Sequence, residues 1–361
     1  MMAWRLDRRT VLRLGLTGSA WALAESIQAR LRKARAAAPA ADPRERRLAN
    51  IRQLTFGGQN AEAYFDWTGT RLVFQSTRPP FGCDQIFTMR ADGSDVRLVS
   101  TGKGRTTCAF FFPDGRRIIY ASTHLGGADC PTPPDRSQGY VWPIYRSYEI
   151  FAADLASGAL TRLTDNDGYD AEGAVSPDGK RIVFTSLREG DLDLYAMDAD
   201  GGSVRRLTDG IGYDGGPFFS WDGRYVVFRA ARPASGADLD EYRSLLGQSL
   251  VRPRRLEIFS MQTDGSGLTQ LTRNGAANFS PFMHPDSRKI VFSSNLHDPS
   301  GRSFALYLID RDGGGLERLT WTESFASFPM FSRDGSQLVF CSNRGAAAPR
   351  DLDVFICDWV A

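Results

Sequence analysis

The stretch SPDGKRIVFTS, residues 176–186, combines a tight turn with one apolar strand. Near copies return along the chain as FPDGRRIIYAS from 112, SWDGRYVVFRA from 220, HPDSRKIVFSS from 284 and SRDGSQLVFCS from 332. A segment that recurs in this way indicates a repeat architecture, in which each copy is one supersecondary unit. Functional residues are therefore sought among the positions that do not repeat.

Three signatures of the repeat each occur six times. The turn-and-strand signature ends at Phe74, Tyr120, Phe184, Phe228, Phe292 and Phe340. A second short strand starts at 85, 149, 193, 257, 305 and 353, as in DLYAMDADG, and a third closes on RLT or a relative at 53, 97, 162, 206, 270 and 318. The constant order of the three signatures predicts six equivalent units.

Each unit reads as a four-stranded antiparallel meander. Asp-Gly after a strand supplies a hairpin turn with a left-handed position that glycine fills at low cost. Runs such as RIVF are apolar on both faces, so both faces of each sheet must be covered. Radial stacking of six sheets covers them. The predicted fold class is all-β, a six-bladed β-propeller of four-stranded antiparallel blades.

The chain ends predict how the ring closes. The last unit stops at DVFICDWVA without a fourth strand, whereas NIRQLT at 50–55 is a strand without a unit. We expect this N-terminal strand to complete the last blade. Two units carry insertions near 124–148 and 230–256, and Leu239, Tyr242, Leu246 and Leu250 in the second one predict a short amphipathic helix over the channel mouth.

The repeat SPDGKRIVFTSLREGDLDLYAMDADGGSVRRLT, together with its five ordered counterparts, resembles the six-bladed propeller repeat of the TolB family of bacterial periplasmic proteins. The resemblance covers residues 50–361 and implies a periplasmic location. TolB itself has a separate α/β domain before its propeller, used in its envelope partnerships, and only residues 41–49 are left for a linker here. The chain therefore looks like a propeller-only relative, to which the Tol-Pal role of TolB does not transfer.

The first forty residues read as an export signal. Arg8 and Arg9 precede an apolar run from Val11 to Ala24, which is too short to span a bilayer, and Ala38-Pro39-Ala40 offers a cleavage site. The paired arginines resemble the twin-arginine signal of Tat export. The expected organisation is an export signal at 1–40, a linker at 41–49 and a propeller at 50–361, with no membrane span in the mature chain.

Charge and cysteine content exclude several classes of protein. Beyond residue 40 the chain carries 36 Lys and Arg against 40 Asp and Glu, so no basic footprint for nucleic acid is left. The cysteines are odd in number and scattered, and we expect no disulfide framework and mostly small buried apolar residues, with any pairing left open. They are Cys83, Cys108, Cys130, Cys341 and Cys357.

Polar residues gather in the loops after the second and fourth strands, which emerge on one face of a meander propeller. The predicted binding face takes Arg78, His124, Arg188, Arg232, Asn295, His297 and Arg344 from the first set and Gln59, Asn60, Glu62, Asp170, Glu172, Asp214, Asn278 and Glu323 from the second. Polar groups that converge at a channel mouth form a default binding site. The structural alternative is that these are ordinary solvated loop residues, or that an arginine after one strand forms only an interblade ion pair with an aspartate of the next blade.

The three histidines give the clearest sequence evidence for or against an enzyme, because histidines that lie together could bind a catalytic metal ion. His284 falls on the opposite face, so His124 and His297 are the candidate ligands of a divalent cation, with Asn295 or a carboxylate as a third. DNDGYDAE, residues 165–172, crowds four carboxylates and weakly resembles a calcium loop, although it lacks the EF-hand spacing. No GxSxG or GxxxxGK[ST] motif occurs.

The sequence favours a non-enzymatic, exported, monomeric propeller scaffold. It would bind a protein or peptide partner at the cell envelope through the face that carries the two insertions. The alternative is a metal-dependent lyase or hydrolase that processes carbohydrates or small molecules at the channel mouth.

Overall fold

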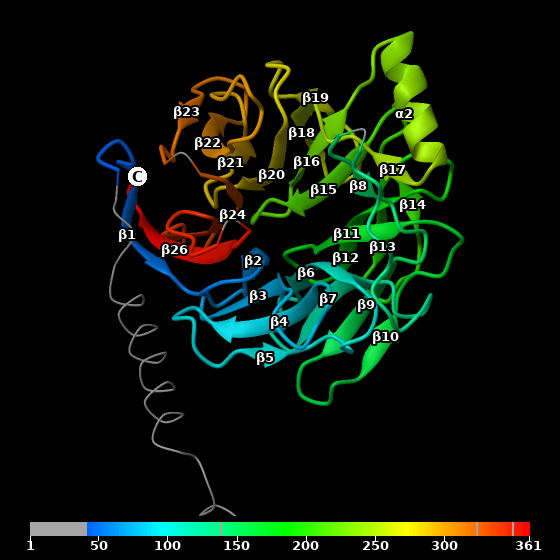
Figure 1. Cartoon of the computed structure of the whole chain (residues 1–361), viewed down its shortest axis with the longest axis horizontal. Coiled ribbons are helices and arrows are strands. Elements are labelled where there is room, and N and C mark those ends of the chain that lie inside the picture. The colour runs from blue at the N-terminus through cyan, green and yellow to red at the C-terminus, as the bar shows by residue number, and fades with distance from the viewer. Residues whose placement is uncertain (1–41, 138, 323, 349) are drawn as a thin grey trace, which may run out of the picture. The chain divides into compact units, whose positions relative to one another are not determined.

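The computed structural model describes residues 42–361 except 138, 323 and 349. In this part of the chain, six four-stranded antiparallel sheets are arranged radially around one axis (Figure 1). The predicted six-bladed β-propeller is confirmed. The described residues hold no helix long and apolar enough to cross a membrane. The predicted export signal lies outside the described residues.

Each blade starts with an inner strand beside the axis. The inner strands are β2 (Asn60–Phe65), β6 (Thr106–Phe111), β11 (Asp170–Val175), β15 (Asp214–Phe219), β20 (Asn278–Met283) and β24 (Ala326–Phe331). The second strands are β3 (Arg71–Ser76), β7 (Arg117–Ser122), β12 (Arg181–Ser186), β16 (Tyr225–Ala231), β21 (Lys289–Ser294) and β25 (Gln337–Ser342).

Two further strands complete each blade outwards. The third strands are β4 (Gln85–Arg90), β9 (Glu149–Asp154), β13 (Asp193–Asp198), β18 (Leu256–Gln262), β22 (Ala305–Asp310) and β26 (Asp353–Trp359). The fourth strands are β5 (Arg97–Leu98), β10 (Leu160–Arg162), β14 (Arg205–Arg206), β19 (Thr269–Gln270), β23 (Glu317–Arg318) and β1 (Leu48–Gln53). Blades are numbered 1 to 6 in the order of their inner strands.

The repeated Ser-x-Asp-Gly segment is a self-capped turn. In blade 3 the Ser176 hydroxyl donates to Asp178 at 2.6 Å and accepts the backbone N–H of Arg181 at 2.9 Å. Gly179 has a φ of 70°, the left-handed conformation that glycine adopts without a steric penalty. The Ser220 and Ser332 hydroxyls donate to Asp222 and Asp334 in the same way. Blades 3, 4 and 6 share this serine-capped turn between their first and second strands.

Aromatic pairs between the second and third strands form the core of each blade. Phe184 and Phe228 are fully buried. Phe184 packs against Tyr195 with ring centroids 6.0 Å apart, and Phe228 stacks on Phe259 at 5.7 Å. Burial of one such side chain stabilises the fold by about 1.5–3 kcal/mol. The apolar runs therefore reflect sheets covered on both faces.

The N-terminal strand closes the ring. β1 pairs antiparallel with β26, with Leu48 opposite Trp359 and Gln53 opposite Phe355. The backbone N–H of Leu54 continues the pairing to the carbonyl of Val354 at 2.7 Å. The predicted completion of the last blade is confirmed, and β1 starts at Leu48, two residues before the predicted strand.

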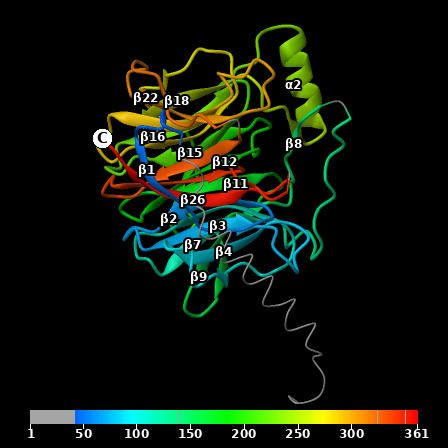
Figure 2. The same ribbon diagram turned by 60° about the vertical axis from the view of Figure 1, so that its left-hand side comes forward.

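The two insertions join each other. β8 (Trp142–Pro143) from blade 2 pairs with β17 (Leu250–Val251) from blade 4, and α2 (Ala237–Gly247) precedes β17. We call the paired segments 124–148 and 230–256 the strap. Figure 2 shows α2 and β8 on the same side of the propeller. The predicted helix is confirmed with Tyr242 buried, whereas Leu250 lies in β17.

One disulfide is present among the five cysteines, whose pairing the sequence left open. Cys83 after the second strand of blade 1 is bonded to Cys130 in the strap. Neighbouring loops bring these two cysteines together although they are 47 positions apart in the sequence. The spacing of cysteines along the sequence does not reveal this contact. Cys341 and Cys357 are free and buried, as expected for small apolar residues, and Cys108 is free and half-buried.

Candidate functional site

A β-bulge interrupts the inner strand of every blade at its third residue. The register of each inner strand shifts there, and the bulged residue has a φ between 52° and 59°. Such a left-handed backbone is uncommon for residues other than glycine, and bulges are frequent beside functional sites. In blade order the six residues are Glu62, Cys108, Glu172, Gly216, Ser280 and Phe328.

All six bulged residues line one cavity of about 1060 Å³. The strap contributes Trp142 and Tyr145, while Arg229 and Tyr169 come from blades 4 and 3. The volume lies at the upper end of the range for pockets that hold small ligands. We call the part of the cavity formed by the bulged residues and their contacts the floor.

The carboxylate of Glu172, on the floor, has hydrogen-bond and ion-pair partners on several elements. Its carboxylate accepts hydrogen bonds from the hydroxyls of Tyr213 at 2.8 Å, Tyr169 at 3.1 Å and Thr185 at 3.1 Å. Arg229 forms an ion pair with it at 3.1 Å, and the backbone N–H of Gly216 donates to it as well. These five contacts hold the carboxylate in place.

Glu62 occupies the same place in blade 1 with a much poorer set of partners. The backbone N–H of Cys108 donates to its Oε2 at 3.1 Å. Burial raises the pKa of Glu62 to about 7, since loss of hydration disfavours the carboxylate more than this hydrogen bond favours it. Burial also raises the pKa of the Cys108 thiol, so the thiol is not an activated nucleophile.

An aromatic wall is formed by blades 5 and 6 around the bulged residue Phe328. Phe279 contacts Phe304, Phe325 and Phe328 with ring centroids 5.2, 6.2 and 5.9 Å apart. Trp142 of the strap approaches Phe279 at 6.5 Å. The cavity therefore offers an apolar wall next to a polar floor, the arrangement that gives a binding site both affinity and orientation.

Arginines surround the entrance. Arg252 and Arg255 pair with acidic residues of α2, Glu241 at 3.0 Å and Asp238 at 2.6 Å. Arg136, Arg302 and Arg350 are exposed and also line the cavity, and none of the three forms an ion pair with a described carboxylate. The entrance thus has cationic groups available for a ligand.

Comparison with known proteins supports the fold. Residues 140–237 match the family described as TolB beta propeller domain. Similar solved structures include a putative TolB from Agrobacterium tumefaciens, with a TM-score of 0.56, 20% identity and coverage of 84% of this chain and 91% of that one. The chain is a six-bladed β-propeller that is similar in fold to these TolB propellers.

Two further structures share the fold of the TolB-like propeller. TolB from Acinetobacter baumannii has a TM-score of 0.55 and 20% identity over 82% of this chain, which spans 65% of that TolB. An oligogalacturonate lyase in complex with manganese has a TM-score of 0.51 and 13% identity, with 86% and 93% of the two chains covered. At such low identity these similarities show the fold alone.

The predicted arginines of the TolB-like propeller lie over the aromatic pairs of their own blades. Arg78 lies 5.2 Å from the ring of Phe74, and Arg188 lies 5.4 Å from that of Phe184. The other two, Arg232 and Arg344, lie 5.2 Å from the rings of Phe259 and Phe340. They follow the second strand at a constant offset, so their positions belong to the repeat.

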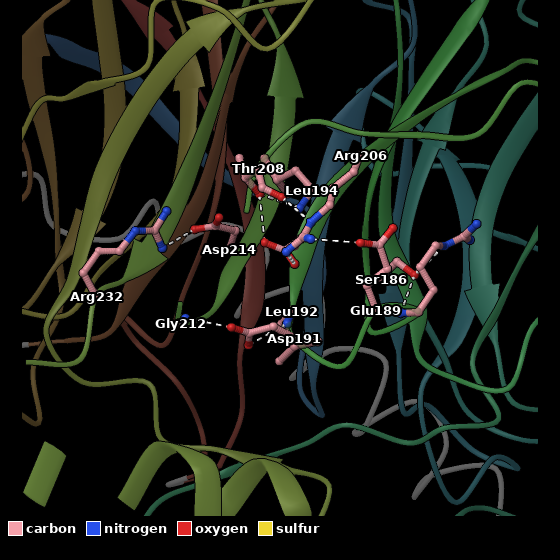
Figure 3. Close-up of polar contacts among 12 residues, drawn as sticks. Ser186, Glu189, Asp191, Leu192, Leu194, Arg206, Thr208, Gly212, Asp214 and Arg232 are labelled. Atoms are coloured by element: carbon pink, nitrogen blue, oxygen red, sulfur yellow. Dashed lines mark hydrogen bonds and ion pairs between the residues drawn. The ribbon is translucent and has the colours of Figure 1, made fainter. Parts of the chain in front are cut away.

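The predicted carboxylates and amide beside these arginines are buried partners. Asp170 pairs with Arg188 at 3.1 Å, and Asp214 pairs with Arg232 (Figure 3). Asn278 donates to the carbonyl of Leu256 at 2.8 Å. Burial raises the pKa of Asp214 to about 6. In both ion pairs the two partners belong to the same blade, so these charges are structural but do not form the interblade pairs of the structural alternative.

His124 and His297 lie in different blades with separate partners. His124 shares a hydrogen bond with the Ser122 hydroxyl at 2.8 Å, and His297 is 3.4 Å from that of Ser303. Asn295 lines the cavity and accepts the backbone N–H of Ala277. Among the described residues no three His, Cys, Asp or Glu are grouped as metal ligands. Glu323 lies outside the described residues.

The carboxylates of DNDGYDAE point to different partners. Asp165 pairs with Arg162 at 2.7 Å, Asp170 with Arg188, and Glu172 reaches the floor. Of the residues predicted from the loops, Glu62, Glu172, Asn295 and Gln59 line the cavity. The remaining described ones have the partners given above or are held by their own blade, as Asn60 is by Ser76.

Several cavity residues were not predicted from the sequence, among them Cys108, Arg229, Ser280, Phe328 and Trp142. The sequence did contain a signal for the four bulged positions that were not predicted. The inner strands NAEAYF, TTCAFF, DAEGAV, DGGPFF, NFSPFM and ASFPMF end alike in large apolar residues but differ at their third position. Alignment of the inner strands would have identified the variable ring.

Proposed function

We propose that this protein is an exported scaffold that binds a peptide segment of a protein partner in the cavity beneath the strap. The observation that carries the proposal is the cavity of about 1060 Å³, which has an aromatic wall, a polar floor and an arginine entrance on the face with both insertions. A site of that volume suits several residues of a peptide. The shared fold with proteins named TolB is compatible with a scaffold.

The entrance favours a partner segment with acidic residues outside the cavity. Arg302 and Arg350 are exposed and free of described carboxylates, so they can pair with Asp or Glu of a partner. Arginine is well suited to this role because its planar guanidinium binds carboxylates in a bidentate manner. The Phe279 cluster would hold an apolar side chain of the same segment.

Export to the periplasm is part of the proposal. The segment with Arg8 and Arg9 predicts it, and the Cys83–Cys130 bond supports it, since structural disulfides persist in oxidising compartments. The partner would then be a protein of the cell envelope. We propose that the propeller acts there as a monomer.

Site-specific photo-crosslinking in the native periplasm tests the proposal. A crosslinking residue at position 302 should trap a discrete partner, whereas one at Lys180, in an Asp-Gly turn on the other face, should not. The crosslink from position 302 should fall at least about fivefold in an Arg350→Ala background, because that substitution removes a cationic partner. Equal trapping from both positions would contradict binding at this face.

An enzyme at the same cavity is the second candidate function. Glu62 favours it, because a carboxyl group with a pKa of about 7 suits general acid or base catalysis at neutral pH. The oligogalacturonate lyase in complex with manganese shows that the fold can accompany such an activity. Cleavage of oligogalacturonate by the purified protein, lost in Glu62→Gln, would favour the enzyme over the scaffold.

A further inference from the structure

The floor of the cavity carries one carboxylate more than its arginines neutralise. Five strongly ionisable groups contribute to it: Glu62, Asp84, Arg105, Glu172 and Arg229. Arg105 pairs with Asp84 at 2.9 Å, and Arg229 pairs with Glu172 at 3.1 Å. Among the described residues no cation forms an ion pair with Glu62. A ligand that reaches the floor therefore meets a carboxyl group without an ion-pair partner, which is mostly ionised above about pH 7.

A second polar group on the floor also lacks a partner. Ser280 is 4% exposed and lines the cavity, and its hydroxyl oxygen is buried without a hydrogen bond to any described residue. A buried hydroxyl without a partner costs free energy that a bound ligand can recover. This observation is independent of the charge balance and indicates a ligand with a polar group, to which the hydroxyl can offer a hydrogen-bond acceptor.

Ser280, Phe328 and Glu62 are consecutive around the ring, in blades 5, 6 and 1. The side of the ring next to Glu62 therefore offers a carboxylate, an aromatic ring and a hydroxyl. The other side is occupied by the Glu172 and Arg229 pair with its tyrosines. A cation would bind on the first side.

We propose that the floor binds a primary ammonium group, with Glu62 as its counter-ion and the Ser280 hydroxyl as a second acceptor. The proposal rests on the proposed function, because it assigns the group of the partner peptide that enters deepest. An ammonium donates three hydrogen bonds and accepts none, and aromatic faces attract it. An ammonium can direct its N–H bonds to different acceptors, whereas the planar fork of a guanidinium matches the two oxygens of one carboxylate.

The site should depend on pH through Glu62. The titratable and charged groups around it are Tyr64, Cys108, Cys341, Asp84, Glu172 and Arg229. With a pKa of about 7, Glu62 is mostly ionised at pH 8 and mostly protonated at pH 6. An alkylammonium remains charged at both values. Its apparent affinity should therefore be about tenfold lower at pH 6 than at pH 8, in proportion to the ionised fraction.

Calorimetric titration of the purified protein with n-butylammonium, and with n-butanol as a neutral control, tests the site. We expect binding of the ammonium at pH 8 and at least about tenfold weaker binding of n-butanol. Glu62→Gln should lower the affinity for the ammonium at least about tenfold, and Ser280→Ala about threefold. Glu189→Gln is the matched control, because Glu189 pairs with Arg206 on the same face outside the cavity.

Two further ligands distinguish the source of the ammonium. Leucinamide presents a free α-ammonium, and Nα-acetyl-lysine amide presents a lysine side chain. Tighter binding of either one supports the site and identifies the group that the partner inserts. Equal binding by wild type and Glu62→Gln, equal binding of n-butanol, or displacement of n-butylammonium by stoichiometric Mn²⁺ or Ca²⁺ at Glu62 would overturn the proposal. Crosslinking at position 302 tests partner binding separately, so the two proposals can fail independently.

Discussion

Glu62 and Glu172 hold equivalent positions in blades 1 and 3 but differ in their surroundings. Glu172 has three hydroxyl donors and an arginine, whereas Glu62 has the backbone N–H of Cys108. Desolvation of Glu62 is therefore not offset, and its pKa rises to about 7. A carboxylate that costs stability in the folded protein is typical of a binding site, because function and stability compete there.

Removal of this charge should stabilise the fold at alkaline pH. Between pH 4.5 and 7 the folded protein keeps a proton on Glu62 that the unfolded chain has released, so stability falls as the pH rises through this window. Above about pH 7 the full cost applies. Glu62→Gln should then raise the free energy of unfolding by about 1–3 kcal/mol at pH 8 and have little effect at pH 5.

Urea denaturation of both proteins at pH 5 and pH 8 measures this difference. Asp193 and Asp214, whose pKa values burial raises to about 6, contribute equally to wild type and variant and cancel in the comparison. Glu189→Gln, on an exposed ion pair, should leave stability nearly unchanged. An equal effect of Glu62→Gln at both pH values would contradict the role assigned to burial.

The strap is built from elements that are each too small to be stable alone. β8 and β17 have two residues each, and they pair with one another and with no other described strand. The Cys83–Cys130 bond fixes the blade 2 segment to blade 1 across 47 positions of sequence. In the chain-entropy model, closing a loop of this size raises the free energy of the unfolded chain by about 4 kcal/mol.

Loss of the bond should loosen the strap more than the propeller. Residues 126–130 and 135–137 are exposed, so this part of the strap has few buried contacts of its own, whereas Ile144 and Tyr148 are buried. In Cys130→Ser we expect proteolytic cleavage within residues 125–141 to accelerate at least about tenfold, while the blades remain resistant. Dithiothreitol should reproduce the effect in wild type and add nothing in the variant. Equal cleavage rates in oxidised wild type and variant would show that the strap is held by other contacts.

Sequence patterns predicted the elements that repeat and missed the contacts between elements that do not. The turn of SPDGKRIVFTS and the apolar strand after it are local, so the propeller and its closure followed from counting copies. Arg188 and Asp214 drew attention as charged loop residues, but each completes a pair inside its blade. The pairing of β8 with β17 and the meeting of Cys83 with Cys130 depend on three-dimensional proximity.

At the scale of the whole molecule, the ring depends on its first and last strands. β1, the fourth strand of blade 6, buries the side chains of Leu48 and Ile51. The side chain of Arg52, the residue after Ile51, is exposed. The preceding Glu45 forms an ion pair with Arg344 at 3.0 Å, in which both side chains are at most 3% exposed. Arg344 therefore serves closure in this structure, which explains why a loop arginine of blade 6 is buried.

Closure can be tested with two substitutions on one strand. Ile51→Ala removes a buried side chain from β1 and should cost about 2–5 kcal/mol, whereas Arg52→Ala should change stability by less than about 0.5 kcal/mol. For a chain of this size the first value corresponds to a fall in Tm of about 5 °C. Deletion of residues 50–56 should have a larger effect and expose the edge of β26, which would promote association between copies. Calorimetric melting and light scattering measure both effects, and a deletion variant that melts like the parent would show that the ring is closed without β1.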